Sequence, residues 1–270
     1  MTEVSVAIPT SILQVESTLL LKTLRVHQVA RTLSIFGVST AVFYRDFETG
    51  EQEHEEYAEL IRRQWSFFFT PPYLRRRLVP IHPLLRHVGM LPPIRLSWFD
   101  APRELEPGDE RVAFIAKSKR GFKAHVDSSR VFKAVGDCRE GFSVVRVSSP
   151  ESGVVECLDK EFYRGPRLVF KNSLKQVYED SAGFKIIATS RYGRVPGVDD
   201  LFALGMHERV LIVFGSPRRG LHEMARAEGI GELGEVWNTV PGQLVKTVRT
   251  EEALIITLGL VNYALRLKGL

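Results

Sequence analysis

The chain has 270 residues, of which 44% are apolar and 26% are charged, with a formal net charge of +5. This balance is sufficient for a buried core and excludes a disordered chain, a collagen and a coiled coil. The longest apolar run, 253–265, is interrupted by Thr257 and Asn262 and is too short to span a bilayer. The start of the chain lacks the basic region of a secretory signal, so we expect a cytoplasmic protein.

Two cysteines, Cys138 and Cys157, are too few for a disulfide framework or a cysteine-rich metal site. They favour a reducing compartment, and the sequence leaves open whether they meet. The seven histidines are scattered, and no HExxH motif is present, so we expect no metal and no membrane association.

The first part of the chain, 1–92, has the pattern of a strand, a helix and a second strand. Ser17 is predicted to cap the helix and Gly37 to end it. The predicted strands are Val4–Ile8 and Thr40–Tyr44, and a second helix is predicted over Glu53–Phe69. Strand, helix and strand in succession are typical of a parallel sheet.

The middle part, 93–166, changes its periodicity. Short apolar runs follow one another closely, with Gly, Pro, Asp and Ser between them, which predicts a small β-barrel or sandwich. The runs are Val112–Ala116, Ala124–Val126, Val131–Val135, Phe142–Val147, Val154–Leu158 and, at the edge of this part, Arg167–Phe170.

The last part, 167–270, returns to alternating strands and helices. Strands are predicted over Phe184–Thr189, Val210–Phe214 and Glu235–Val240, and helices over Arg219–Glu228 and Thr250–Leu267. The simplest architecture is an α/β domain made from both chain ends, 1–92 and 167–270, with the β module 93–166 inserted between them.

A basic stretch lies between Leu60 and Phe99, where no Asp or Glu occurs. Arginines bind phosphates and aromatic rings stack on unpaired bases, so the stretch favours RNA binding, although its aromatic residues are equally explained as core. The β module repeats the basic bias. The predicted RNA-binding residues are Arg62, Arg63, Arg75, Arg76, Arg77, Arg86, Lys117, Lys119, Arg120 and Lys123.

Three loops at predicted strand ends stand out in the last part: 189–193, 215–220 and 238–243. Ligands of open α/β sheets bind beyond the carboxyl ends of the strands. The third loop leads to Arg249-Thr250-Glu251-Glu252-Ala253, where Thr250 is suited to cap the last helix and the two glutamates suit its first turn. Capping does not account for Asn238, Gln243 or Arg249.

These segments resemble the SPOUT-class RNA methyltransferases, in the archaeal and eukaryotic branch with an inserted β-barrel. The matching residues are Val6–Leu13, Pro72–Arg75, Val213–Gly215 with Gly220-Leu221, Asn238–Gln243 and Arg249–Ala253. The resemblance implies a trefoil-knotted parallel-sheet domain, an OB-fold-like barrel, a homodimer and S-adenosylmethionine as cofactor. The implied cofactor-binding residues are Thr189, Ser190, Phe214, Gly215, Gly220, Asn238, Thr239, Pro241, Gly242, Gln243, Thr250 and Ala253.

Methyl transfer needs no protein nucleophile, but an acceptor nitrogen that carries a proton needs a base or a group that stabilises its anion. Arg249 and Arg191 are the candidates for anion stabilisation, and Glu251 or Glu252 for the base. The 249–253 segment also resembles the helix start of bacterial uridine-N3 methyltransferases, which favours ribosomal RNA and uridine N3. Ribose 2′-oxygen and guanine N1 stay open; the chain lacks the Asn-x-x-x-Arg motif of ribose methylation near its start.

Two other functions compete with this one. A catalytically silent RNA-binding or assembly factor would have the same basic stretch and β module. A dinucleotide-dependent oxidoreductase would explain the GxGxxG pattern at 229–234, but that pattern follows a predicted helix and precedes a strand, the reverse of a true fingerprint.

Overall fold

The computed structural model describes residues 2–100, 104–119 and 121–267. They form two compact units, one of Met1–Trp65 with Gly165–Leu270 and one of Ser66–Arg164. Each is treated by itself below. The predicted boundaries lay at residues 92 and 167. No helix of the described residues has the length and apolar character that crossing a membrane requires.

The first unit contains a parallel sheet of six strands in the order β11-β9-β10-β1-β2-β8. Both chain ends contribute strands, and β1 lies between β10 and β2, with Val6 opposite Ile212 on one side and Ala41 on the other. This confirms the predicted α/β class. The strands are β1 Glu3–Pro9, β2 Thr40–Tyr44, β8 Arg167–Lys171, β9 Lys185–Arg194, β10 Arg209–Val213 and β11 Glu235–Trp237.

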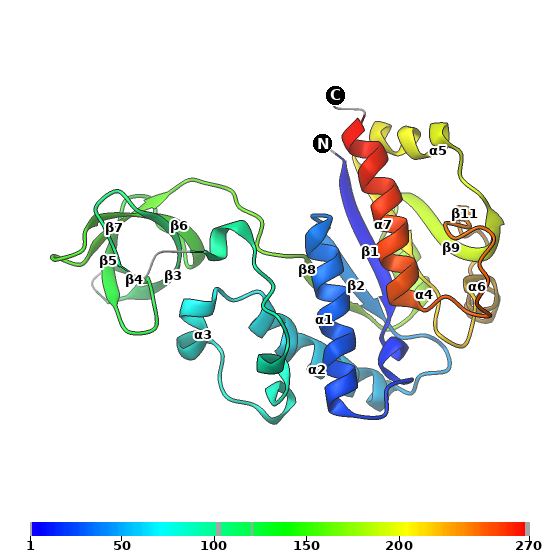
Figure 1. Ribbon diagram of the computed structural model, residues 1–270, viewed down its shortest axis with the longest axis horizontal. Helices are drawn as coiled ribbons and strands as arrows, with labels where there is room; N and C mark the ends of the chain where they lie inside the picture. Colours follow the sequence, from blue (N-terminus) through cyan, green and yellow to red (C-terminus); the bar gives the residue numbers. More distant parts are fainter. Residues whose placement is uncertain (1, 101–103, 120, 268–270) are drawn as a thin grey trace. The chain divides into compact units, whose positions relative to one another are not determined.

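Helices cover both faces of this sheet. Ala7, Leu211 and Val213 point to the face covered by α4 and α6, while their neighbours Val6 and Ile212 point to the opposite face. Figure 1 shows α1 and α7 side by side across the sheet, and the two helices contact each other. The helices are α1 Leu19–Ile35, α2 Glu51–Phe68, α4 Leu174–Glu179, α5 Val198–Ala203, α6 Leu221–Glu228 and α7 Thr250–Leu267.

Two predictions for this unit are corrected. The hydroxyl of Thr18, not Ser17, caps α1 by accepting a hydrogen bond from the amide of Leu21 at 3.2 Å. The run Arg167–Phe170, predicted among the short runs of the β module, is the edge strand β8 and pairs in parallel with β2. A short apolar run has no periodicity that tells a strand of the parallel sheet from a strand of the barrel. Its position directly after the barrel strands in the chain therefore led to the wrong assignment.

The second unit contains a closed, OB-fold-like barrel with the strand order β3-β4-β5-β7-β6. Alternate side chains fill its interior, among them Ala113, Ile115 and Val145, which are fully buried. The strands are β3 Glu110–Ser118, β4 Gly121–His125, β5 Val131–Val135, β6 Gly141–Ser149 and β7 Val154–Leu158, and the helix α3 Pro72–Leu78 precedes them. The predicted β-barrel is therefore confirmed.

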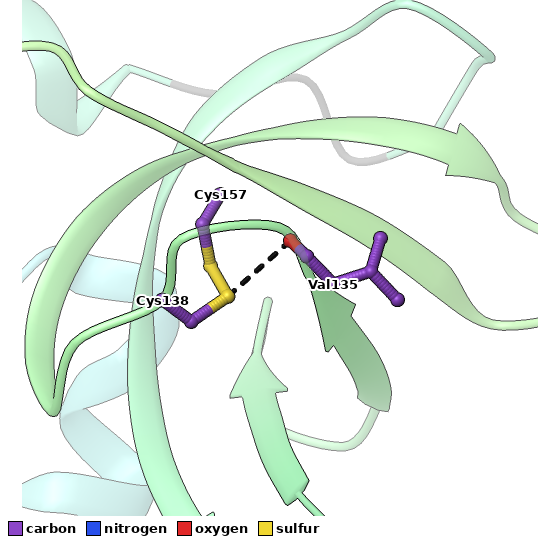
Figure 2. Close-up of a disulfide and its surroundings, with 3 residues drawn as sticks. All are labelled: Val135, Cys138 and Cys157. Carbon is purple, nitrogen blue, oxygen red and sulfur yellow. Dashed lines mark hydrogen bonds between the residues drawn. A yellow bond between two sulfur atoms is a disulfide. The ribbon is translucent and has the colours of Figure 1, made fainter.

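A disulfide joins Cys138, just after β5, to Cys157 on β7 (Figure 2). The Cα atoms are 5.4 Å apart, and Sγ of Cys138 lies 3.3 Å from the carbonyl oxygen of Val135. The bond settles the pairing that the sequence left open. Such bonds are rare in cytosolic proteins outside hyperthermophiles, so it weighs against the reducing compartment inferred from the low cysteine content.

Candidate active site

A cavity of about 440 Å³ opens at the carboxyl ends of β9, β10 and β11. The three loops singled out in the sequence form its walls together with the start of α7. The predicted site residues that line it are Thr189, Ser190, Arg191, Phe214, Gly215, Gly220, Asn238, Thr239, Gln243, Thr250 and Ala253. Residues more than sixty positions apart in the chain therefore meet at one edge of the sheet, as expected for an open parallel sheet.

The Gly215 loop is held close to its own far end. A Cβ atom at Gly215 would lie 3.1 Å from the carbonyl oxygen of Arg219 and 3.3 Å from the amide nitrogen of Leu221, so only glycine fits without displacement. The hydroxyl of the buried Tyr44 donates to the carbonyl oxygen of Phe214 at 2.5 Å. The hydroxyl of Thr250 donates to the carbonyl oxygen of Gly215 at 3.4 Å, which connects the loop to α7.

Asn238 connects the other two loops. Its side-chain amide donates to the carbonyl oxygen of Arg191 at 3.0 Å, and its side-chain oxygen accepts from the amide of Val240 at 3.1 Å. Thr239 is buried, and its hydroxyl lies 2.7 Å from that of Thr257 in α7. These bonds fix the loops relative to one another and to α7.

Two predicted cofactor residues lie outside this cavity. Pro241 and Gly242 are not among its walls. Gly242 lines an adjoining cavity of about 460 Å³ that shares Arg191, Asn238 and Gln243 with the first. The Arg191 guanidinium lies 4.7 Å from the ring centre of Tyr192 and donates to the carbonyl oxygen of Lys246 at 3.2 Å, so it stands between the two spaces.

The other predicted catalytic residues surround a third, smaller cavity of about 280 Å³ next to α1. There Arg25, only 6% exposed, forms ion pairs with both Glu16 and Glu251. Arg249 extends from the rim with its guanidinium 3.9 Å from Glu16, and 64% of its side chain is exposed. The structure thus separates Arg249, Glu251 and Glu252 from the main cavity, where only Arg191 of the predicted catalytic set is found.

The start of α7 differs from the prediction. The carbonyl oxygen of Arg249 accepts the bond from the amide of Ala253 at 2.9 Å, so Arg249 is the N-cap rather than Thr250. The Glu252 carboxylate accepts from the amide of Arg249 at 2.8 Å, which is half of a capping box. Glu251 and Glu252 therefore both have structural partners.

Two neighbouring arginines, Arg218 and Arg219, lie at one wall of the main cavity. Arg219 pairs with Glu48 at 2.8 Å and with Glu223 at 2.7 Å. Its neighbour Arg218, which also lines the cavity, forms no ion pair with a described residue. The cavity therefore combines backbone groups and small side chains with cationic groups at its edge, an arrangement suited to a ligand with an aromatic part and an anionic end.

The predicted RNA-binding residues fall into three groups. Arg62 and Arg63 are neutralised by ion pairs with Glu55 and Glu59. Arg75 is half-buried, with its guanidinium 4.4 Å from the ring centre of Phe67, and burial lowers its pKa. The exposed residues are Arg76, Arg77, Arg86, Lys117, Lys119 and Lys123, while Arg120 lies outside the described residues.

The GxGxxG pattern has a structural explanation. Gly229 ends α6 in the left-handed conformation, with φ of 67°. Gly234 has φ of 74°, and a Cβ atom there would lie 2.7 Å from the carbonyl oxygen of Ile186. The pattern thus forms the turn between α6 and β11, and no helix begins within it as a dinucleotide site requires.

Sequence reasoning missed Trp237 and Arg25. Trp237 is 1% exposed and lines the main cavity, where its indole nitrogen donates to Glu235 at 3.0 Å. Its place directly before the Asn238 loop was a signal for it. Arg25 had no signal, because its partner Glu251 comes from the far end of the chain and a separation of 9 positions from Glu16 fits no regular helical or strand spacing.

Comparison with known families bears on these loops. Residues 3–261 match the family described as "Putative RNA methyltransferase". The chain belongs to this RNA methyltransferase family. The match spans both the sheet with its three loops and the inserted barrel, so the family includes both units.

Relatives of this RNA methyltransferase family member match along most of their length. An uncharacterized protein of Halobacterium salinarum is 27% identical over 94% of this chain and 97% of its own. An uncharacterized protein of Haloarcula marismortui is 27% identical over 94% of this chain and 96% of its own. The human 28S rRNA (uridine-N(3))-methyltransferase is 26% identical over 94% of this chain and 76% of its own length.

Proposed function

We propose that this protein is an S-adenosylmethionine-dependent RNA methyltransferase whose cofactor binds in the cavity at the ends of β9, β10 and β11. The observation on which this rests is that one cavity gathers ten of the twelve predicted cofactor residues from three loops and α7. Its volume of about 440 Å³ suits a ligand of nucleoside size. The cofactor, when bound, supplies an electrophilic methyl group.

The residues present fit such a ligand. The glycine at 215, where a Cβ atom would crowd Arg219, lets its loop fold closely enough to form a wall of the cavity. Thr189, Phe214, Gly215 and Asn238 would hold the adenine end through their backbone. The unpaired Arg218 would hold the carboxylate end, because a guanidinium matches a carboxylate in shape and charge.

We propose ribosomal RNA as the substrate and uridine N3 as the acceptor. The relationship to a 28S rRNA (uridine-N(3))-methyltransferase over 94% of this chain supports this assignment. Uridine N3 carries a proton, so the reaction develops negative charge on the base, which a nearby cation stabilises. Arg191 at the edge of the main cavity is the first proposed cation. The exposed Arg249, which lies on the rim of the separate cavity beside α1, is the second.

Glu251 and Glu252 were the candidates for the base. Their carboxylates are held by Arg25 and by the amide of Arg249. We therefore propose that they position Arg249 and the start of α7, that the N3 proton passes to water, and that the uridine anion so formed is stabilised chiefly by Arg191 and Arg249 before its N3 takes the methyl group. An Arg249→Ala protein that binds cofactor normally and methylates at the wild-type rate would remove Arg249 from this mechanism.

We also propose a homodimer and a trefoil knot. The dimer is supported by exposed apolar side chains on the adjacent helices α1 and α7: Leu20, Leu21, Leu24, Ile255, Ile256, Leu260 and Tyr263. Such a surface is larger than isolated exposed apolar residues and marks an interface. Sedimentation should give a dimer, and Leu24→Glu should give a monomer; a monomeric wild-type protein would rule the dimer out.

The decisive test is calorimetric titration with S-adenosylmethionine. Gly215→Leu should reduce binding by at least about 100-fold, because the new side chain meets the backbone of Arg219 and Leu221 and displaces the loop that walls the cavity. The matched control is Gly231→Leu, where a Cβ atom has no neighbour within 4 Å. The same control tests the dinucleotide-site alternative at 229–234. Gly231→Leu should leave the affinity for S-adenosylmethionine unchanged, and a titration of the wild-type protein with NAD should show no binding.

The silent RNA-binding factor is the other outcome of the same experiment. A folded wild-type protein that binds RNA but no S-adenosylmethionine would overturn the proposed methyltransferase activity and favour the RNA-binding factor. Mapping of methylated nucleotides in ribosomal RNA incubated with enzyme and cofactor would then test the acceptor atom.

A further inference from the structure

Aromatic rings from three strands lie side by side on the outer face of the barrel. Phe114 of β3 is directly opposite His125 of β4 and Phe142 of β6. The ring centres of Phe114 and Phe142 are 5.3 Å apart, and those of Phe114 and His125 are 6.3 Å apart. Because the neighbours Ala113 and Ile115 fill the barrel interior, alternation turns Phe114 outward.

Arg164 extends this arrangement beyond the strands. Its guanidinium lies 5.8 Å from the ring centre of Phe142 and 6.0 Å from that of Phe162, and the Phe162 ring lies 6.1 Å from Trp98. We call His125, Phe114, Phe142, Phe162 and Trp98 the aromatic row. All five rings are half-buried, and Arg164 is exposed with no ion pair to a described residue.

A shallow, open cavity of about 600 Å³ lies beside the row. It is lined by Phe142, Lys160, Glu161, Phe162, Tyr163 and Arg164. Aromatic rings wall a space that also contains the unpaired Arg164, the Glu161 carboxylate, and Lys160, which forms an ion pair with Glu110. A nucleobase has a flat face that stacks on such rings and a polar edge that bonds to such groups.

A second cationic group lies near the other end of the row. Lys123 of β4 and Lys133 of β5 are directly opposite each other and exposed. Like charges directly opposite each other destabilise a strand pair. Neither lysine forms an ion pair with a described residue, so a bound anion would reduce the repulsion between the two ammonium groups. Lys123 is two residues from His125 and therefore shares its face of the strand.

His125 belongs to the stacking surface rather than to the cations. Burial, followed by the charges of Arg77 and Lys123, lowers the pKa of its imidazole. The ring is consequently neutral at neutral pH. Its Nδ1 atom is buried and has no hydrogen-bond partner among the described residues.

We propose that the aromatic row is a binding site for unpaired RNA. A base enters the cavity and stacks against Phe142 and Phe162, Arg164 binds the adjacent phosphate, and Lys123 with Lys133 binds the backbone further along the strand. The site rests on the proposed RNA substrate and adds residues outside the basic set predicted from the sequence. Interleaved cations and rings match a single strand better than they match a protein, whose interface centres lack such unpaired charge.

The test uses the full chain and fluorescence anisotropy with a labelled single-stranded RNA of about 12 nucleotides. Phe142→Leu and Phe162→Leu retain apolar volume but remove the aromatic face. Each should weaken binding about tenfold. A duplex of the same sequence should bind more weakly than the single strand and be little affected by either variant. A 2-aminopurine base in the strand should change its fluorescence on binding to wild type and less so with the variants.

A matched pair of arginine variants provides the control. Arg164→Ala and Arg209→Ala each remove one charge and one guanidinium–phenylalanine contact, the latter 4.6 Å from the Phe184 ring in the sheet unit. Arg164→Ala should weaken single-strand binding about tenfold, and Arg209→Ala less than twofold. Because Arg164 is exposed, its variant tests the site even if a phenylalanine variant fails to fold.

The site is overturned if Arg164→Ala binds like Arg209→Ala, or if duplex and single strand bind equally. Calorimetry with S-adenosylmethionine on the same proteins separates this result from the proposed enzyme activity. Normal cofactor binding with unchanged RNA affinity in every variant rejects the aromatic row alone. Loss of RNA affinity in a protein that binds no cofactor supports the row and rejects the methyltransferase.

Discussion

The sheet unit and the barrel present their candidate binding surfaces in different ways. In the sheet unit the strands are buried on both faces, so the cavity lies beyond the strand ends, on loops fixed by Asn238 and Gly215. In the barrel the strands bury one face in the interior, so a surface forms along their outer face, in the cross-strand register of Phe114 with Phe142. The first surface depends on long-range polar contacts and the second on strand pairing.

Removing Arg25 tests the long-range contacts of the sheet unit and should have the largest effect on stability. In Arg25→Met, Glu16 and Glu251 lose their buried partner, so the free energy of unfolding should fall by about 3–5 kcal/mol. Chemical denaturation measures the change. Arg139→Met, which removes an exposed pair with Asp137, is the control and should change stability by less than about 0.5 kcal/mol. An equal loss of unfolding free energy in Arg25→Met and Arg139→Met would contradict the idea that the sheet unit depends on long-range polar contacts.

Removing the disulfide tests the barrel. The bond closes a loop between residues 19 positions apart, so Cys138→Ala with Cys157→Ala should destabilise the barrel by about 3 kcal/mol. Thermal unfolding with and without reductant measures it, and reductant should affect the wild type but not the double variant. Cofactor affinity should not change, because neither cysteine lines the cavity of the sheet unit. A loss of cofactor binding would show that the two surfaces are not independent.

The smallest effect concerns the turn between β4 and β5. Burial opposes ionisation of Asp127, but hydrogen bonds from the amides of Arg130 and Ser129 and from the Arg130 side chain outweigh it and lower the pKa of Asp127 to about 2. The stabilisation is complete above the unfolded pKa and is lost as the pH falls through the folded value. Asp127→Asn should cost about 1 kcal/mol at pH 6, and the difference from wild type should shrink from about pH 4 downward and vanish only below about pH 2. Urea denaturation of both proteins across this pH range measures the difference. A difference in unfolding free energy that does not change with pH would show that ionisation of Asp127 is not its source.

Much of the fold was predictable because local pattern and tertiary environment agree. The strands Thr40–Tyr44, Val131–Val135 and Val154–Leu158 and the helix Thr250–Leu267 have the bounds that their periodicity predicts. The helices Leu174–Glu179 and Val198–Ala203 were missed, because six residues give too little periodicity to recognise.

The candidate site was predictable only in part. The three loops could be grouped because strand ends of a parallel sheet meet at one edge, and all three line one cavity. The separation of Arg249 and Glu251 from that cavity was not predictable, since it depends on the ion pairs that α1 contributes through Arg25. Contacts between residues over two hundred positions apart leave no trace in local spacing.

The strand order of the sheet has a consequence for how the chain acquires its structure during synthesis. Strand β1 is made first, yet its partner β10 follows about 200 residues later, with Val6 opposite Ile212. The barrel strands β3 to β7 pair with one another and lie close together in the chain. They can therefore form the closed barrel before β10 and β8, the later partners of β1 and β2, have been synthesised. Until β10 emerges from the ribosome, the apolar edge of β1 lacks its neighbour, and the nascent chain passes through an aggregation-prone stage that chaperones would have to cover.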